Sequence, residues 1–256
     1  MFSSHGPSVR ELAVQGLSSV ERGYDLLAPK FDHTPFRTPD RMLDAVEETL
    51  AQHEGTFGAG LDVCCGTGAG IGMLSRLCRG RITGVDLSAG MLAEAERRHG
   101  ADAERVDFVR ADARALPAAL ADTYDLAVSF GAFGHFLPKE RPALFSGIHA
   151  ALREGGVFAF PIGAPLPLGS PVWWATTGFD AAMRVRNAVW RPPFVMYYRT
   201  FPLGPVREDL QAAGFTVETV PIDHFGRRPD GTPNWRLLLA RKPGRSADTG
   251  ACGRVG

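Results

Sequence analysis

The chain has 256 residues, of which 45% are hydrophobic and 22% charged, and this composition excludes a chain that is disordered throughout. Lys and Arg together number 28, as do Asp and Glu, so no net field favours nucleic acid or an anionic membrane. The most apolar stretch, near residues 157–168, is interrupted by three prolines, so we expect no membrane-spanning helix. The four cysteines, two of them adjacent, suggest neither a disulfide framework nor a metal site and favour a reducing, cytoplasmic setting.

The first clear helix is predicted from residue 38 onward. Thr38 can cap it, Pro39 suits its first position, and Gly55 ends the pattern. Between them, apolar residues recur at helical spacing at Leu43, Val46 and Leu50. Residues 1–37 form a separate N-terminal segment, in which apolar residues near Val9 to Leu17 suggest a short helix.

Short apolar runs then alternate with longer periodic segments, which is typical of a parallel sheet covered on both faces. Seven runs are predicted as strands: Gly60 to Cys64, Ile82 to Asp86, Val106 to Arg110, Leu126 to Phe130, Val157 to Ile162, Phe215 to Ile222 and Trp235 to Arg241. The turn region of residues 226–233 joins the last two as a hairpin. We therefore predict an α/β fold with a doubly wound, seven-stranded, mostly parallel sheet and an antiparallel last strand.

Helices are expected between these strands. The predicted ranges are a helix beginning near Ile71, Ser88 to Arg98 with Ser88 as cap, Lys139 to Arg153, and Pro205 to Ala213. The alternation lapses over residues 163–202, which we interpret as an insertion after the fifth strand that forms a lid over the domain of residues 38–242. Residues 243–256 are predicted to be a flexible tail.

A glycine-dense turn follows the first strand and reads Cys65-Gly66-Thr67-Gly68-Ala69-Gly70. Glycine is needed where backbone approaches a ligand or takes a positive φ. A dinucleotide fingerprint requires a third glycine where Ile71 stands, which weakens a nicotinamide interpretation. Twenty residues after Gly66, Asp86 ends the second strand, where a carboxylate can accept hydrogen bonds from ribose hydroxyls. The pattern predicts a nucleoside beside the turn.

Five segments in order carry a family resemblance: Leu61 to Gly68, Val85 to Leu92, Ala111 to Ala113, Asp125 to Phe136 and Leu152 to Gly156. They resemble the motifs of class I S-adenosylmethionine-dependent methyltransferases, which have a Rossmann-like fold. The resemblance covers roughly residues 24–242 and is greatest to the branch of quinone C-methyltransferases and small-molecule methyltransferases. One departure is Cys64, where many members carry glycine.

This resemblance implies S-adenosylmethionine as cofactor and a role for each matching residue. Asp62 would bind its ammonium, the backbone of Gly66, Thr67 and Gly68 would lie against its methionine and ribose parts, and Asp86 would hold the ribose. Asp112 would accept from the adenine amino group, and the Ala113 N–H would reach a ring nitrogen. The resemblance also implies roles for apolar and aromatic residues. The adenine base would lie between Leu87 and Met91, and the methionine part of the cofactor would lie over Phe130. Tyr24 would close over the methionine end.

Methyl transfer needs an aligned nucleophile and, for some acceptors, a base. His135 follows the fourth strand, where ligands bind in open α/β sheets, and an ordinary pKa near 6.5 suits a base. It is the candidate catalytic residue. The same region lacks the Asn/Asp-Pro-Pro-Tyr run of methyltransferases that act on adenine or glutamine nitrogens, which disfavours a DNA-base substrate.

The insertion of residues 163–202 is rich in aromatic residues, which suit an apolar or planar acceptor. It also carries four arginines, at 184, 186, 191 and 199, and we interpret these as solvated, with binding of a substrate carboxylate or phosphate as the alternative. The predicted function is methyl transfer from S-adenosylmethionine to O, N or C of a small, hydrophobic or aromatic metabolite. No nucleic acid or membrane partner is expected, and the oligomeric state is open.

Three alternatives remain open at this stage. A methyltransferase fold that binds the cofactor without turnover is one, because no catalytic residue is as diagnostic as the cofactor set. A nicotinamide-dependent oxidoreductase is the second and is disfavoured by Ile71. A protein or RNA acceptor is the third, and zero net charge disfavours it.

Overall fold

Apolar runs of Val, Ile, Leu and Phe form one central sheet, in a computed structural model that describes residues 6–244. Within that range the sheet has seven strands in the order β3-β2-β1-β4-β5-β7-β6. The strands are β1 Gly60–Val63, β2 Ile82–Asp86, β3 Val106–Arg110, β4 Tyr124–Val128, β5 Leu152–Gly163, β6 Thr216–Pro221 and β7 Trp235–Arg241. The predicted seven-stranded α/β fold is confirmed.

Strand direction places the carboxyl ends of most strands at one edge. β1 pairs in parallel with β2 and β4, β2 with β3, and β4 with β5, whereas β7 lies antiparallel between β5 and β6. The order of the strands reverses between β1 and β4: from β1 the chain runs outward to β2 and β3, and it then returns to β4 and runs outward to β5 on the other side. Ligands of doubly wound sheets bind outside the carboxyl ends at such a reversal. We therefore expect a ligand site at the loops that follow β1, β2, β3 and β4.

Eight α-helices occur within the described residues. They are α1 Val9–Leu17, α2 Val20–Leu27, α3 Asp40–Glu54, α4 Ala69–Leu77, α5 Ala89–His99, α6 Arg141–Ala151, α7 Pro171–Val189 and α8 Leu203–Ala212. Serine side chains cap four of them, at Ser8, Ser19, Ser88 and Ser170. The predicted cap at Ser88 is confirmed. None of the helices in residues 6–244 is long and apolar enough to cross a membrane.

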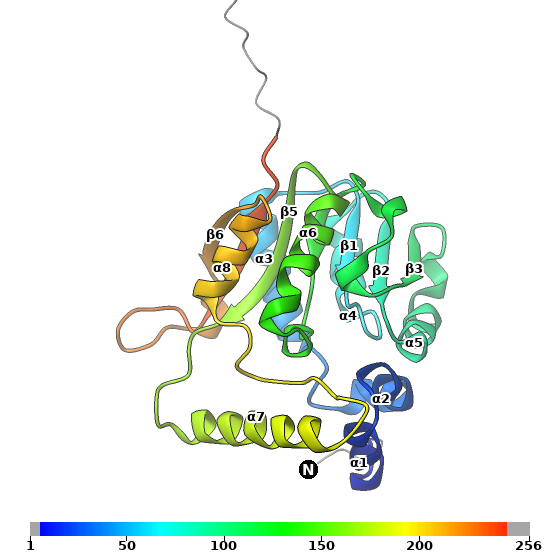
Figure 1. The fold of residues 1–256 in the computed structure, drawn as a ribbon. Helices are drawn as coiled ribbons and strands as arrows, with labels where there is room; N and C mark the ends of the chain where they lie inside the picture. The colour runs from blue at the N-terminus through cyan, green and yellow to red at the C-terminus, as the bar shows by residue number, and fades with distance from the viewer. Residues whose placement is uncertain (1–5, 245–256) are drawn as a thin grey trace, which may run out of the picture.

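Two buried clusters hold the layers together, one on each face of the sheet. One packs apolar residues of α6 and α8, including Phe145 and Leu210, against the β5 residues Phe158 and Phe160. The other packs α3 and α4, including Leu50, onto the opposite face. Figure 1 shows α6 and α8 in front of the sheet and α3 behind it. Each fully buried Leu or Phe contributes about 1.5–3 kcal/mol relative to exposure.

Several predicted boundaries are wrong by a few residues. α3 begins at Asp40, Pro39 is its N-cap residue, and no side chain caps the helix, so the predicted cap at Thr38 is incorrect. β5 begins at Leu152, which pairs with Tyr124 before a shift in register. The predicted start at Val157 is therefore five residues late. Gly155 lies within the strand at φ +79°, because glycine allows the bulge after which pairing resumes.

The N-terminal helices and α7 lie outside the two core layers. Figure 1 shows α1, α2 and α7 together beyond the ends of the strands. The Trp190 indole donates to the Leu17 carbonyl at 3.2 Å, and the Arg186 guanidinium donates to the Ser18 carbonyl at 3.1 Å. The insertion segment, residues 163–202, thus contacts the N-terminal segment, residues 6–37. Most of the predicted tail, from residue 245, lies outside the described residues.

Candidate functional site

The glycine turn after β1 has an unusual backbone. Cys64, Gly66 and Gly68 all have positive φ, at 60°, 54° and 81°. A side chain on Gly68 would meet the His99 ring at 2.9 Å, so packing on α5 requires glycine there. No atom lies within 4 Å of the corresponding position on Gly66. Gly66 therefore presents bare backbone to open space, as a ligand-binding turn does.

The Asp86 carboxylate, at the end of β2, braces this turn. Its Oδ2 accepts from the Gly66 N–H at 2.9 Å, and its Oδ1 accepts from the Ser88 N–H at 2.9 Å. Burial raises the pKa of Asp86. Two carboxylate oxygens offer about four lone pairs, so Asp86 keeps capacity for a further donor.

The Asp62 carboxylate in β1 is buried and incompletely paired. Its Oδ1 has no hydrogen-bond partner among the described residues. Burial, and then the negative charge of Asp86, raise the pKa of Asp62 well above its usual range. A side chain on Gly70 would lie 2.4 Å from the other oxygen and 3.1 Å from the Phe130 ring. Asp62, Gly70 and Phe130 thus meet where α4 begins.

The remaining predicted cofactor residues lie around the same edge but differ in exposure. Asp112 follows β3 and accepts from the Arg114 guanidinium, which lowers the pKa of Asp112. Ala113 is buried and begins a short 3₁₀ turn. Leu87 is 36% exposed, whereas Met91 is 1% exposed and belongs to the core side of α5. Leu87, but not Met91, is therefore accessible to a ligand in this structure.

Tyr24 and His135 form a hydrogen-bonded pair across 111 residues of sequence. The Tyr24 hydroxyl lies 2.8 Å from His135 Nε2, and His135 Nδ1 lies 2.6 Å from the Val195 carbonyl. A carbonyl only accepts, so Nδ1 carries the proton and Nε2 accepts from Tyr24. Burial lowers the pKa of His135 and raises that of Tyr24. The imidazole is therefore neutral, with its basic nitrogen toward Tyr24.

Asp25 fixes the N-terminal segment to α5, which sequence reasoning missed. Its Oδ1 accepts from the Ser88 hydroxyl at 2.6 Å and from the Gly90 N–H at 2.8 Å. A side chain on Gly90 would meet the Asp25 backbone at 2.9 Å, so the two helices touch. Ser88 also follows Asp86, and Tyr24 precedes Asp25. This contact therefore places Tyr24 next to the end of β2.

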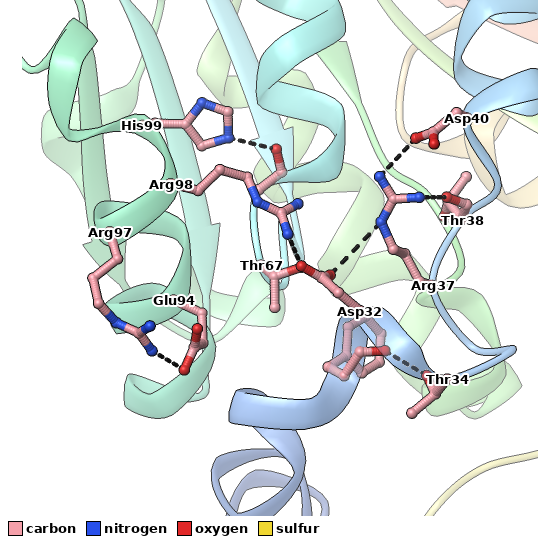
Figure 2. A network of polar contacts seen from close by, with 12 residues as sticks. Asp32, Thr34, Arg37, Thr38, Asp40, Thr67, Glu94, Arg97, Arg98 and His99 are labelled. Carbon is pink, nitrogen blue, oxygen red and sulfur yellow. Dashed lines mark hydrogen bonds and ion pairs between the residues drawn. The ribbon is translucent and has the colours of Figure 1, made fainter. Parts of the chain in front are cut away.

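Asp32 forms a second attachment, shown in Figure 2. The Thr67 hydroxyl in the glycine turn donates to Asp32 Oδ1 at 2.7 Å. Arg98 of α5 forms an ion pair with the other oxygen, and Arg37 lies 3.7 Å from Oδ1. Thr67, predicted to contribute backbone to a cofactor site, therefore also holds the N-terminal segment through its side chain. Sequence carries no signal for a pair 35 residues apart.

The end of the insertion segment closes over His135. The Tyr197 N–H donates to the Gly134 carbonyl at 2.8 Å, two residues from the Val195 carbonyl that holds His135. The Phe194 ring stacks on Tyr24 with centroids 6.4 Å apart and stands edge-on to His135. Aromatic residues of this segment were predicted to line an acceptor site. Phe194 lies beside His135, whereas Trp174 is 63% exposed.

Comparison with known proteins agrees with this geometry. Residues 61–156 match a family model described as a methyltransferase domain. The chain is 29% identical over 124 residues to CRG1 of Saccharomyces cerevisiae, a probable S-adenosylmethionine-dependent methyltransferase. The aligned region makes up 48% of this chain and 41% of that protein. The chain thus covers about two fifths of the length of this relative.

Solved structures share the fold. The structure of a DhpI–SAH complex has a TM-score of 0.60 and 22% identity, over 93% of this chain and 100% of that one. An O-methyltransferase family protein of Burkholderia thailandensis has a TM-score of 0.62 and 15% identity, over 95% and 66%. Sequence match and fold together confirm the predicted resemblance at the general level. Residues 61–156, which match the methyltransferase-domain model, include the ends of β1 to β4 at which the residues described above converge.

Proposed function

We propose that this chain transfers the methyl group of S-adenosylmethionine to a small acceptor molecule. The observation that carries the proposal is the buried Asp62 Oδ1 without a partner, beside a glycine turn that faces open space. A buried carboxylate oxygen without a partner is costly, and such groups concentrate at functional sites. The methyltransferase match over residues 61–156 supports the same reading.

The residues present fit the parts of this cofactor. The Asp62 carboxylate would accept from the ammonium of the methionine part, which would restore the charged form that burial disfavours. Asp86 keeps acceptor capacity for a ribose hydroxyl, while its bonds to Gly66 and Ser88 fix its orientation. Leu87 offers apolar surface to the base. Asp112, although engaged by Arg114, lies after the neighbouring strand.

When bound, the cofactor supplies an electrophilic sulfonium methyl, and this chain's residues align the acceptor and manage its proton. His135 is the proposed base. Its Nδ1 proton is held by the Val195 carbonyl, so Nε2 is the nitrogen available to take a proton. In the structure Nε2 accepts from Tyr24, and an acceptor hydroxyl or amine would replace or share that donor.

The surroundings of His135 favour a small, partly apolar acceptor. Tyr24 and Phe194 place ring faces and edges around the imidazole. Ring surfaces exclude water, and water would compete with the acceptor for the methyl group. We propose that the insertion segment acts as a lid over this acceptor, as predicted from its position after the fifth strand. The resemblance to small-molecule methyltransferases supports the same acceptor class.

Calorimetric titration with S-adenosylhomocysteine tests the cofactor site. We expect binding by the parent chain and at least about tenfold weaker binding by Asp86→Ala, because charge-assisted hydrogen bonds to the ribose are lost. Asp223→Ala removes a carboxylate that pairs with Arg227 at the surface and serves as control. Absence of binding, or equal binding by Asp86→Ala, would contradict the proposal.

Turnover is tested separately with methyl-labelled S-adenosylmethionine and a set of phenols, carboxylic acids and amines. Label transfer to any acceptor, lost in His135→Ala, is expected. Cofactor binding without transfer to any of them would favour the non-catalytic alternative.

A further inference from the structure

A hollow of about 280 Å³ lies between the insertion segment and the beginning of α6. Its lining includes Leu137 and Arg141 on one side and Arg184, Tyr197, Arg199 and Thr200 on the other. It is separate from the glycine turn, and none of the predicted cofactor residues lines it. Three arginines in one small hollow call for a chemical explanation.

Two of these arginines form no ion pair within residues 6–244. Arg141 forms an ion pair with Asp209 at 2.7 Å and donates to the Thr200 carbonyl. The guanidinium groups of Arg184 and Arg199 pair with no carboxylate among residues 6–244; their partners there are the Tyr197 ring, the Trp173 ring and the Thr177 hydroxyl. The buried Asp180 carboxylate, which accepts from the Tyr198 and Arg199 N–H groups, is the nearby negative charge, and it forms no ion pair with either guanidinium. The guanidinium groups of Arg184 and Arg199 therefore remain available to an anion.

Thr200, one of the lining residues, has a buried hydroxyl without a partner in residues 6–244. Thr200 is 7% exposed, and its hydroxyl oxygen has no hydrogen-bond partner among the described residues. A buried hydroxyl without a partner costs free energy that a bound acceptor oxygen would recover. Arginine forks and a hydroxyl are the donors that bind carboxylates and phosphates. The donor set thus matches an anionic oxygen group.

The four arginines of the insertion segment separate into two classes. Arg186 donates to the Ser18 and Pro192 carbonyls, and Arg191 donates to the Asn187 carbonyl, so both serve local structure. Arg184 and Arg199 line the hollow and rest on aromatic rings, with centroid distances of 5.5 and 4.8 Å. Cation–π contacts hold a guanidinium in place without using its hydrogen-bond donors. Both side chains are exposed, as the solvated interpretation expects, and their ring contacts hold them beside the hollow.

The hollow adjoins the proposed transfer site. Tyr197, which lines it, donates its N–H to the Gly134 carbonyl next to His135, and Leu137 follows His135 by two residues. We propose that this hollow binds a carboxylate or phosphate of the acceptor, so that the enzyme methylates an anionic small molecule. This inference rests on the proposed function. To the proposed methyl transfer it adds that the acceptor is negatively charged and that Arg184 and Arg199 bind this charge.

The test uses the full chain and three probes: phenyl phosphate, benzoate and the neutral benzyl alcohol. Each is titrated by calorimetry with and without saturating S-adenosylhomocysteine. We expect one or both anions to bind and benzyl alcohol to bind at least about tenfold more weakly, because it lacks the charge that the arginines recognise. The tighter anion identifies whether the acceptor group is a phosphate or a carboxylate. Equal binding of all three probes, or no binding of either anion, would overturn the inference.

Variants locate the binding within the molecule. Arg184→Gln and Arg199→Gln should each weaken anion binding about tenfold, whereas Arg191→Gln, on the same segment, should not. Arg184→Lys, which keeps the charge, should retain most of the affinity. An equal loss in Arg191→Gln would indicate general electrostatics and overturn the site. S-adenosylhomocysteine binding, expected to be unchanged in all four variants, keeps failure of the cofactor proposal distinguishable from failure of the anion site.

Discussion

The Tyr24–His135 pair has a defined protonation pattern. The Val195 carbonyl holds the proton on Nδ1, and the Tyr24 hydroxyl donates to Nε2. The hydrogen bond that Tyr24 donates to Nε2 and the burial of His135 both favour the uncharged imidazole. The catalytic candidate is therefore in its basic form at neutral pH without a paired carboxylate.

We expect nitrogen-15 spectra of the histidine side chains to place His135 in the Nδ1–H form down to pH values below 6.5. The pKa of His135 is lowered by burial, so protonation occurs at lower pH than in an unfolded chain. Tyr24→Phe removes the donor to Nε2 and should move the titration back toward pH 6.5. An Nε2–H form, or an unchanged titration in Tyr24→Phe, would disprove the assigned hydrogen bonds.

Asp62 links stability to function at the scale of one residue. Because burial raises the pKa of Asp62, the folded chain holds a proton there at pH values where the unfolded chain has lost it. Its contribution to the free energy of unfolding therefore declines as the pH rises above about 3.9 toward the folded pKa.

Asp62→Asn removes the buried ionisable group. In urea denaturation at pH 7 we expect the variant to be more stable than the parent by about 1 kcal/mol, and the difference to shrink as the pH approaches 4. Binding of S-adenosylhomocysteine should weaken in the same variant. A variant less stable than the parent at pH 7 would mean that the parent's carboxylate is satisfied.

At the scale of elements, Asp25 joins α2 to the beginning of α5. Asp25→Ala removes two hydrogen bonds, to Ser88 and Gly90, and should lower the free energy of unfolding by about 1–3 kcal/mol. Glu21→Gln removes the exposed pair with Arg110 and should cost less than about 1 kcal/mol. Urea denaturation measures both, and equal losses would indicate that Asp25 contributes no more than a surface contact.

Elements were predictable where local pattern decides them. Short apolar runs identified all seven strands, since strands buried on both faces contain few polar residues. The beginnings of β5 and α3 could not be predicted, because the first depends on a bulge at Gly155 and the second on backbone geometry at Pro39. The glycine turn and Asp86 were identifiable as one site because Asp86 stands twenty residues after Gly66. The contacts of Asp25, Asp32 and His99 were not, because they join segments that only the tertiary fold brings together.

At the scale of the whole molecule, the N-terminal and insertion segments contact each other, and the N-terminal segment contacts the glycine turn and α5, where the predicted cofactor residues lie. We expect S-adenosylhomocysteine to slow deuterium uptake in peptides from α2, residues 133–137 and residues 191–197, because ligand binding suppresses local opening. Peptides from α8, which packs on α6 away from the turn, should be unaffected. Equal protection of α8, or none in α2, would contradict closure of these segments over the site.

The N-terminal segment has attachments on two sides: Asp32 to Thr67 in the glycine turn, and Leu17 and Ser18 to Trp190 and Arg186. Lifting it from the turn would therefore also loosen the insertion segment, the proposed lid over the acceptor. By linkage, two ligands that stabilise the same closed arrangement strengthen each other's binding. Departure of the methylated product and reloading of the donor would then depend on one shared displacement, which would set the pace of the catalytic cycle.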